Sequence, residues 1–191
     1  MAILPIYLFD HPVLKKKAKL VRELDDDLRQ QAADMMETMH RANGIGLAAN
    51  QVGSLQRIIV VDISGVEEAA GATPLVMINP EVLFEEGRWV MEEGCLSIPD
   101  IREEVERAER IRVRYRDLDF QVQESDMEAL LARVILHEID HLNGVLFLDR
   151  IGSVRRKLLR GRLNKIARGE CETAYPTVLA DGALKAEFPL S

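Results

Sequence analysis

This chain of 191 residues is poor in the features that mark secreted, disulfide-stapled and membrane-spanning proteins. It has two cysteines, Cys95 and Cys171, and so widely spaced a pair rarely forms a disulfide in a cytosolic protein. No apolar run approaches the roughly 20 residues of a membrane span, so we expect no membrane partner. The first residues, Met1–Pro5, lack the basic start and the small-residue cleavage pattern of a signal peptide. We therefore expect a cytoplasmic protein with reduced thiols.

Basic residues are also fewer than acidic ones, 25 against 32, so the formal net charge is −7 at pH 7. A chain this acidic is not a general nucleic-acid binder. The exception is the segment 150–168, which carries eight basic residues and no acidic one. Hydrophobic residues make up 47% and charged residues 30%, and the length suits one well-packed domain. We expect a monomer with a single catalytic domain over 1–191, in which 169–191 form a flexible tail.

Only four histidines are present, yet two of them fall in the pattern His137-Glu138-Ile139-Asp140-His141. On an α-helix, residues four apart project from one face, so the imidazoles of His137 and His141 can hold one metal ion. Glu138 would lie near that ion without binding it, and a carboxylate there can take a proton from a metal-bound water. Chance produces this pattern in roughly one in a few hundred chains of this length. The motif therefore indicates a metal but not a particular reaction.

Hydrophobic periodicity predicts three helices and several short strands. The helices are expected at 25–42, 125–143 and 151–168, and the strands at 58–62, 75–78, 82–84, 111–116 and 120–123. The second helix would begin at a capping box formed by Ser125 to Glu128. Between Ala129 and Leu142 this helix is apolar nearly all round, which is typical of a buried helix. Histidines and a glutamate in a buried helix need partners, and a metal would supply them.

A third ligand is needed, because catalytic sites of this type usually have three protein ligands and one open position. The other histidines, His11 and His40, are in unpromising settings, and no third histidine follows the motif. Glu170 or Glu172 could supply a carboxylate, although both lie beyond the last predicted helix. Cys95 lies in an accessible Gly-Cys turn, where a thiolate is a strong ligand. A free cysteine is nevertheless more often a small buried hydrophobic residue.

The segment Gly44-Ile45-Gly46-Leu47-Ala48-Ala49-Asn50-Gln51 combines two glycines, small residues and a carboxamide. Glycines let a backbone pass close to a ligand and expose its N–H and C=O groups. The segment is not a phosphate-binding loop, because no Gly-Lys-Ser/Thr follows and no strand precedes it. Taken alone, such a segment is more often a tight turn than a binding site.

Three motifs together make the sequence resemble the bacterial peptide deformylases. They are Gly44–Gln51, Glu93–Ser97 and His137–His141, in the right order and at plausible spacing. The resemblance extends from the region of His11-Pro12-Val13-Leu14 to the C-terminal helix and covers about residues 3–168. It implies an α+β fold with antiparallel strands packed around a central metal-bearing helix, and with a C-terminal helix outside.

The resemblance also implies a reaction and its residues. The metal ligands would be Cys95, His137 and His141, and the ion would be Fe(II), for which Ni, Co or Zn can substitute. Glu138 would act as the base, while the Gln51 side chain and the Leu96 backbone N–H would stabilise the charge that develops on the formyl oxygen. The reaction would be removal of the N-formyl group from the N-terminal methionine of nascent proteins, with release of formate.

Substrate and partner contacts follow from the same resemblance. The residues expected to bind the formyl-methionyl peptide are Ile45, Gly46, Gly94 and Val134. The backbone of 44–46 would pair with the extended peptide like an added strand. The basic helix at 151–168 suits a contact with ribosomal RNA, although a solvated face is the plainer interpretation. The apolar stripe of that helix is expected to consist of Ile151, Val154, Leu158, Leu159, Leu163 and Ile166.

Two departures from the family keep other functions open. Leu136 stands where a glutamine usually precedes the first ligand histidine, and Met127-Glu128-Ala129 replaces a common Asp-Gly at the start of the metal-bearing helix. Leu136 is about 100° around the helix from His137, so it cannot replace a ligand. One alternative is a zinc metallopeptidase of the His-Glu-x-x-His type that uses a late glutamate. The other is a deformylase-like protein that binds N-termini without cleaving them, which only Leu136 favours.

Overall fold

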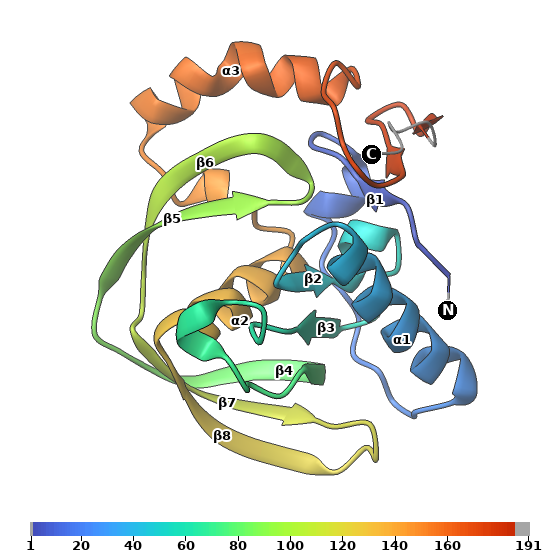
Figure 1. Cartoon of the computed structure of the whole chain (residues 1–191), viewed down its shortest axis with the longest axis vertical. Helices are drawn as coiled ribbons and strands as arrows, with labels where there is room; N and C mark the ends of the chain where they lie inside the picture. The colour runs from blue at the N-terminus through green and yellow to red at the C-terminus, as the bar shows by residue number, and fades with distance from the viewer. Residues whose placement is uncertain (1, 186–191) are drawn as a thin grey trace.

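Helix α2 (Ala129–Leu142) lies at the centre of the fold in the computed structural model, which describes residues 2–185 (Figure 1). Every residue from Ala132 to Leu142 is buried. Antiparallel strands surround this helix, and helix α3 (Ser153–Ala167) lies outside them, across the hairpin of β5 and β6. The structure thus confirms the expected α+β class. Within residues 2–185, no helix is both long and apolar enough to cross a bilayer.

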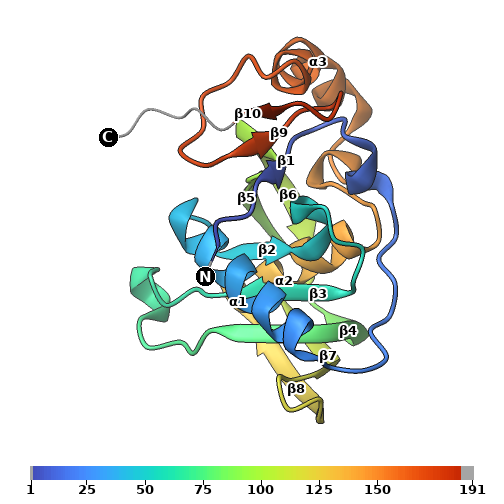
Figure 2. The ribbon, with the colours of Figure 1, turned by 90° about the vertical axis from the view of Figure 1, so that its right-hand side faces the viewer.

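The strands of the described residues form three sheets. The largest is antiparallel, with the order β2-β3-β4-β7-β8, and consists of β2 (Gly46–Ala48), β3 (Ile58–Val61), β4 (Leu75–Glu86), β7 (Arg110–Arg116) and β8 (Val122–Glu128). A hairpin forms the second sheet, from β5 (Trp89–Cys95) and β6 (Ile98–Arg107). The third sheet joins the two ends of the chain and consists of β1 (Ile6–Tyr7), β9 (Thr177–Val178) and β10 (Leu184–Lys185). Figure 2 shows β1 and β9 side by side, and they pair in parallel.

Among residues 2–185, the remaining elements are one long helix and four short 3-10 helices. The long helix is α1 (Asp26–Arg41). It is capped by Asp25, whose side chain accepts a hydrogen bond from the Leu28 N–H at 2.8 Å. Asp26 and Asp27 in its first turn place negative charge at the positive end of the helix dipole, which is favourable. The 3-10 helices are η1 (Pro12–Lys15), η2 (Ala49–Val52), η3 (Glu67–Ala69) and η4 (Phe147–Asp149).

Strand β3 shows how the large sheet is held between two helices. Its side chains alternate, so that Ile59 and Val61 belong to the apolar cluster on the α2 side. Ile58 and Val60 belong to the cluster on the α1 side. All four residues are buried, which explains why the strand reads as a continuous apolar run rather than an alternating one. The sheet therefore fixes α2 on one face while α1 covers the other.

The predicted capping box at Ser125 is wrong, because the helix begins four residues later. Strand β8 continues to Glu128, and Ser125 lies opposite Val113 of β7. Next to that pair, the guanidinium of Arg112 donates to both oxygens of Asp126, at 2.7 and 2.9 Å. The backbone groups of this segment form hydrogen bonds with β7, so they do not need the bonds of a capping box. The strand pairing therefore outweighs the local sequence pattern that predicted a helix.

The two strands predicted at 75–78 and 82–84 are parts of one strand, β4, which continues to Glu86. Asn79 and Pro80 interrupt its pairing with β7, and the register shifts between Ile78 and Glu81. Proline has no N–H to give to the ladder, and Asn79 has a positive φ of 55°. The gap between the two predicted strands therefore marks a bulge and not the end of a strand.

Two expectations for the C-terminal third of the chain need correction. Helix α3 buries Leu159, Leu163 and Ile166, whereas Val154 and Leu158 are 74% and 72% exposed. The predicted apolar stripe is therefore only partly right. The segment expected to be a flexible tail contributes β9 and β10, with Tyr175 and Thr177 buried. Residues 186–191 of that segment lie outside the described residues.

A backbone test follows from the first residue of α2. Ala129 has a φ of 50°, in the left-handed region that a Cβ atom disfavours. Because glycine adopts this region freely, we expect Ala129→Gly to raise the free energy of unfolding by about 1 kcal/mol. The control is Ala33→Gly within α1, which should lower it by about 1 kcal/mol. Urea unfolding measures both, and equal losses in the two variants would contradict the assignment of strain to Ala129.

Candidate metal centre

Three side chains that are typical metal ligands meet at the centre of the fold. Cys95 ends β5, while His137 and His141 lie one turn apart on α2. The Cys95 Sγ atom is 3.1 Å from Nε2 of His141, and the two imidazole centroids are 5.0 Å apart. One ligand atom from each of the three residues lies within 4.8 Å of the others. Neither Glu170 nor Glu172 belongs to this group, so the geometry favours Cys95 as the third ligand.

The chemistry of these three donors fits a metal ion. A thiolate and two imidazoles suit a borderline divalent cation. Burial alone would lower the pKa of His137, but hydrogen bonds with Cys95 and Glu93 outweigh it and raise that pKa to about 10. The surroundings of this imidazole therefore favour a positive charge, whether a proton or a metal ion held on Nε2.

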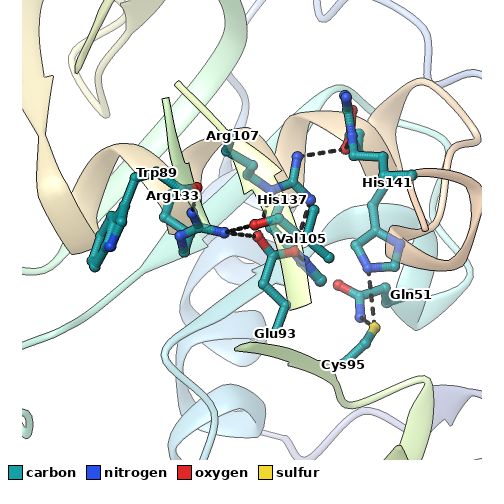
Figure 3. A network of polar contacts seen from close by, with 11 residues as sticks. Gln51, Trp89, Glu93, Cys95, Val105, Arg107, Arg133, His137 and His141 are labelled. Carbon is teal, nitrogen blue, oxygen red and sulfur yellow. Dashed lines mark hydrogen bonds and ion pairs between the residues drawn. The ribbon is translucent and has the colours of Figure 1, made fainter. Parts of the chain in front are cut away.

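Behind His137 lies a buried network of charged side chains (Figure 3). The Nδ1 atom of His137 is 3.0 Å from Oε2 of Glu93. Arg107 donates to both oxygens of Glu93, at 2.5 and 2.9 Å, and Arg133 donates to Oε1 at 2.6 Å. Burial opposes the charged form of Glu93, but hydrogen bonds from His137 and Arg107 hold its pKa at about 2. An ionised Glu93 keeps the proton of His137 on Nδ1 and leaves Nε2 free to bind a metal.

Asp140 ties the same network to the end of α2. Its Oδ2 atom accepts a hydrogen bond from Nη1 of Arg107 at 2.7 Å, and Arg150 donates to both of its oxygens. Because Asp140 lies within the motif, these contacts fix the rotation of the helix that carries the histidines. The roles of Glu93 and Asp140 were not predicted from the sequence, although both residues lie within the three motifs. Nothing in the sequence pointed to Arg107 or Arg150.

Glu138 lies beside the ligands with one free oxygen. The residue is 4% exposed, and its Oε2 atom has no hydrogen-bond partner within the described residues. Burial raises the pKa of Glu138 to about 7. Gly46 allows the backbone of β2 to come this close, because a Cβ atom there would lie 2.5 Å from Oε1 of Glu138 and 2.7 Å from Cγ1 of Val134.

Gln51 is held so that its amide group faces the sulfur atom of Cys95. The residue is 1% exposed, and its Oε1 atom accepts a hydrogen bond from the Ala48 N–H at 2.8 Å. Its Nε2 atom donates to Oγ of Ser97 at 3.2 Å and lies 3.6 Å from Sγ of Cys95. The fixed oxygen leaves the NH₂ group as the part of Gln51 that a ligand at the centre can reach.

A cavity of about 550 Å³ opens onto these groups. Its lining includes every residue predicted to bind substrate, together with the predicted catalytic groups: Ile45, Gly46, Gly94, Val134, Gln51, Leu96 and Glu138. Cys95 and His137 also line it, whereas His141 lies deeper and is 1% exposed. The segment Glu172–Tyr175 forms part of the wall, which the sequence did not predict.

Strand β2 borders this cavity and lies at the edge of the five-stranded sheet. The carbonyl of Ile45 accepts a hydrogen bond from the N–H of Asp62, so it faces the sheet. In an antiparallel strand the direction of the backbone groups alternates, and Gly46 therefore turns its N–H and C=O towards the free edge. An extended peptide could pair there.

Leu136 lies away from the centre. It is 7% exposed and belongs to the apolar cluster between α2 and the five-stranded sheet, together with Ile135 and Ile139. An apolar side chain is well accommodated in that cluster. The absence of the usual glutamine therefore leaves the described contacts of the three ligands intact.

Fold and site together define a metal-dependent hydrolase, because a cysteine sulfur and two imidazoles converge beside a buried carboxyl group whose pKa is raised to about 7. Comparison with known proteins gives the family. The family model for polypeptide deformylase matches residues 3–157. A peptide deformylase of Salinibacter ruber is 48% identical over 187 residues, which cover 94% of this chain and 96% of the relative.

Solved structures agree with this assignment. A peptide deformylase from Legionella pneumophila has a TM-score of 0.80 at 38% identity, covering 88% of this chain and 98% of the other. One from Synechococcus elongatus, in complex with actinonin, has a TM-score of 0.76 at 40% identity, with coverages of 93% and 94%. The chain belongs to the polypeptide deformylase family. It is therefore an enzyme that removes the N-formyl group from the N-terminal methionine of nascent proteins.

The network behind His137 can be tested at Glu93. Glu93→Gln removes the charge shared by Arg107 and Arg133, so we expect unfolding to become easier by about 3 kcal/mol. Metal affinity should fall between about 10-fold and 100-fold, because His137 loses the partner that orients it. Metal titration and urea unfolding measure the two effects. The control is Glu104→Gln on the exposed face of β6. An unchanged metal affinity in Glu93→Gln would show that this contact does not orient the ligand.

Proposed function

We propose that this single catalytic domain performs deformylation with Cys95, His137 and His141 as metal ligands and Glu138 as the base. The observation that carries the assignment is the convergence of one thiol and two imidazoles within 4.8 Å. When bound, the metal would supply a Lewis acid that lowers the pKa of water towards neutrality.

Glu138 would move the proton of the attacking water. Its pKa near 7 suits a group that accepts a proton and then returns it, because neither form is strongly favoured at neutral pH. Its free Oε2 atom supports this role, since no described protein group competes for it. After attack on the formyl carbon, Glu138 would give the proton to the amine of methionine, and formate would leave.

Two donors would stabilise the formyl oxygen as negative charge develops on it. The NH₂ group of Gln51 is supported in this role by the contacts that fix its orientation beside Cys95. The backbone N–H of Leu96 is the second proposed donor, and Leu96 lines the cavity. Donors fixed before the reaction are effective because they need no rearrangement as charge appears.

The peptide would bind as an extra strand along the free edge of β2. Gly46 would offer its N–H and C=O to the substrate backbone, as the alternation of β2 supports. The methionine side chain would enter the cavity between Ile45, Gly94 and Val134. We propose Fe(II) as the native metal, with Ni, Co or Zn able to substitute, and a monomeric enzyme acting in the cytoplasm.

The competing functions are less well supported. A zinc metallopeptidase would need Glu170 or Glu172 as the third ligand, and neither lies with the two histidines. A binder without activity was favoured only by Leu136, which packs among apolar residues away from the ligands.

The test uses two variants that separate chemistry from metal binding. Glu138→Gln should keep about one metal per chain and lower kcat for formate release from formyl-Met-Ala-Ser by about 10³-fold, because the proton carrier is lost. Cys95→Ala should lose the metal itself, whereas a peptidase with a glutamate ligand would keep it. Anaerobic purification, metal analysis and a formate assay on the same samples give both results. Full turnover by Glu138→Gln would rule out Glu138 as the base.

We further propose that helix α3 contacts ribosomal RNA. Six basic residues and no acidic one lie between Ser153 and Ala167. Some of this charge is already paired, since Arg155 contacts Glu103 and Arg156 contacts Asp149. Lys157, Arg160 and Lys165 are exposed and form no ion pair within the described residues, so they are free to meet phosphates.

Charge reversal at the unpaired positions tests this contact. The triple variant Lys157→Glu, Arg160→Glu and Lys165→Glu should weaken ribosome binding by at least about tenfold and flatten its salt dependence. A double control, Lys16→Glu with Lys17→Glu, reverses charge on another exposed surface. Ribosome co-sedimentation at several salt concentrations measures both. Equal binding by the triple variant and the wild type would exclude α3 as the contact.

A further inference from the structure

Tyr175 reaches from the C-terminal segment into the catalytic region. Its hydroxyl group donates a hydrogen bond to the backbone carbonyl of Leu96 at 2.8 Å. The residue is 7% exposed and packs in the apolar cluster that includes Leu47 and Met39, with Leu96 at the margin of that cluster. Burial raises the pKa of Tyr175, so the hydroxyl stays a neutral donor at physiological pH.

The contact acts on the residue whose N–H is proposed to meet the formyl oxygen. The carbonyl of Leu96 belongs to the peptide plane that follows its Cα atom, and the N–H belongs to the plane that precedes it. Because only the two backbone dihedral angles of Leu96 relate these planes, anchoring the carbonyl restricts the direction of the N–H. Without this contact, the Leu96 carbonyl would lose a restraint on its direction within the turn between β5 and β6.

A second contact supports the same turn from the N-terminal segment. The N–H of Phe9 donates to the carbonyl of Ser97 at 2.8 Å. The two anchoring segments are joined to each other, because Ile6 and Tyr7 of β1 pair with Thr177 and Val178 of β9. Figure 2 shows β1 and β9 together beside the β5–β6 hairpin. The carbonyls of Leu96 and Ser97 are thus held by residues that flank the two paired strands β1 and β9.

We propose that Tyr175 is a positioning residue for deformylation, which holds the Leu96 carbonyl so that the Leu96 N–H is directed at the formyl oxygen. This inference rests on the proposed function. It also gives the C-terminal segment a role, because residues 172–175 form part of the cavity wall. The side chain of Thr173 supports the same stretch by donating to the carbonyl of Tyr175 at 2.9 Å.

The effect of Tyr175 should fall on kcat. The Leu96 N–H would be needed most when negative charge develops, so a misdirected donor weakens the transition state more than the bound substrate. We expect Tyr175→Phe to lower kcat about tenfold with KM changed less than about twofold. Tyr175→Met, a second variant without a donor but with a different shape, should show the same loss. Metal content and the unfolding midpoint should stay close to those of the wild type.

The matched control is Tyr115→Phe, which removes the hydroxyl group of a largely buried tyrosine on β7, a strand that does not line the cavity. It should keep the wild-type kcat. An unchanged kcat in Tyr175→Phe would overturn the inference. So would losses that follow the unfolding midpoint or the metal content, or unfolding of both Tyr175 variants, since each shows a structural role only. A metal-loaded wild type that releases no formate would instead refute the proposed function, which separates the two failures.

Discussion

The need to pair the ionisable side chains of one buried helix constrains how the other elements of this structure pack around it. Helix α2 carries five buried residues with ionisable side chains, which are Arg133, His137, Glu138, Asp140 and His141. An unpaired buried charge costs several kcal/mol, so each of these groups must find a partner on another element. The β5–β6 hairpin brings Glu93, Cys95 and Arg107 against the helix for this purpose. One carboxylate oxygen, on Glu138, has no partner among the described residues, and this residue lines the cavity.

The two-residue period of a β-strand explains how β5 serves the centre. Glu93 and Cys95 are two positions apart, so their side chains leave the strand on the same face and both meet α2. Cys95 reaches His141, and Glu93 holds the far nitrogen of His137. Gly94 lies between them and lines the cavity, where it has no side chain to obstruct a peptide. A proposed ligand, the support for another proposed ligand and a residue without a side chain thus come from three consecutive positions.

Features that depend on spacing within one element could be read from the sequence. The histidines of α2 were paired correctly because four residues make about one helical turn. Buried β3 was found because its run of Ile and Val is short and continuous. Features that depend on which elements meet could not be read. The capping-box pattern at Ser125 did not form a helix start, because this segment pairs with β7 as a strand. The ion pairs of Arg107 with Glu93 and Asp140 join residues that are 14 and 33 positions apart in the sequence.

In the proposed function, peptide recognition and proton transfer share one edge of the large sheet. A base must be buried enough for its pKa to rise towards neutrality, yet it must remain within reach of the reacting atoms. Gly46 reconciles these demands, because its missing side chain lets β2 lie against Glu138 while its backbone groups face the free edge. A peptide that pairs with β2 would be held in register with this residue. Its distance from Glu138 would then be set by the same backbone hydrogen bonds that bind it, so a peptide in the wrong register would lose both binding and attack.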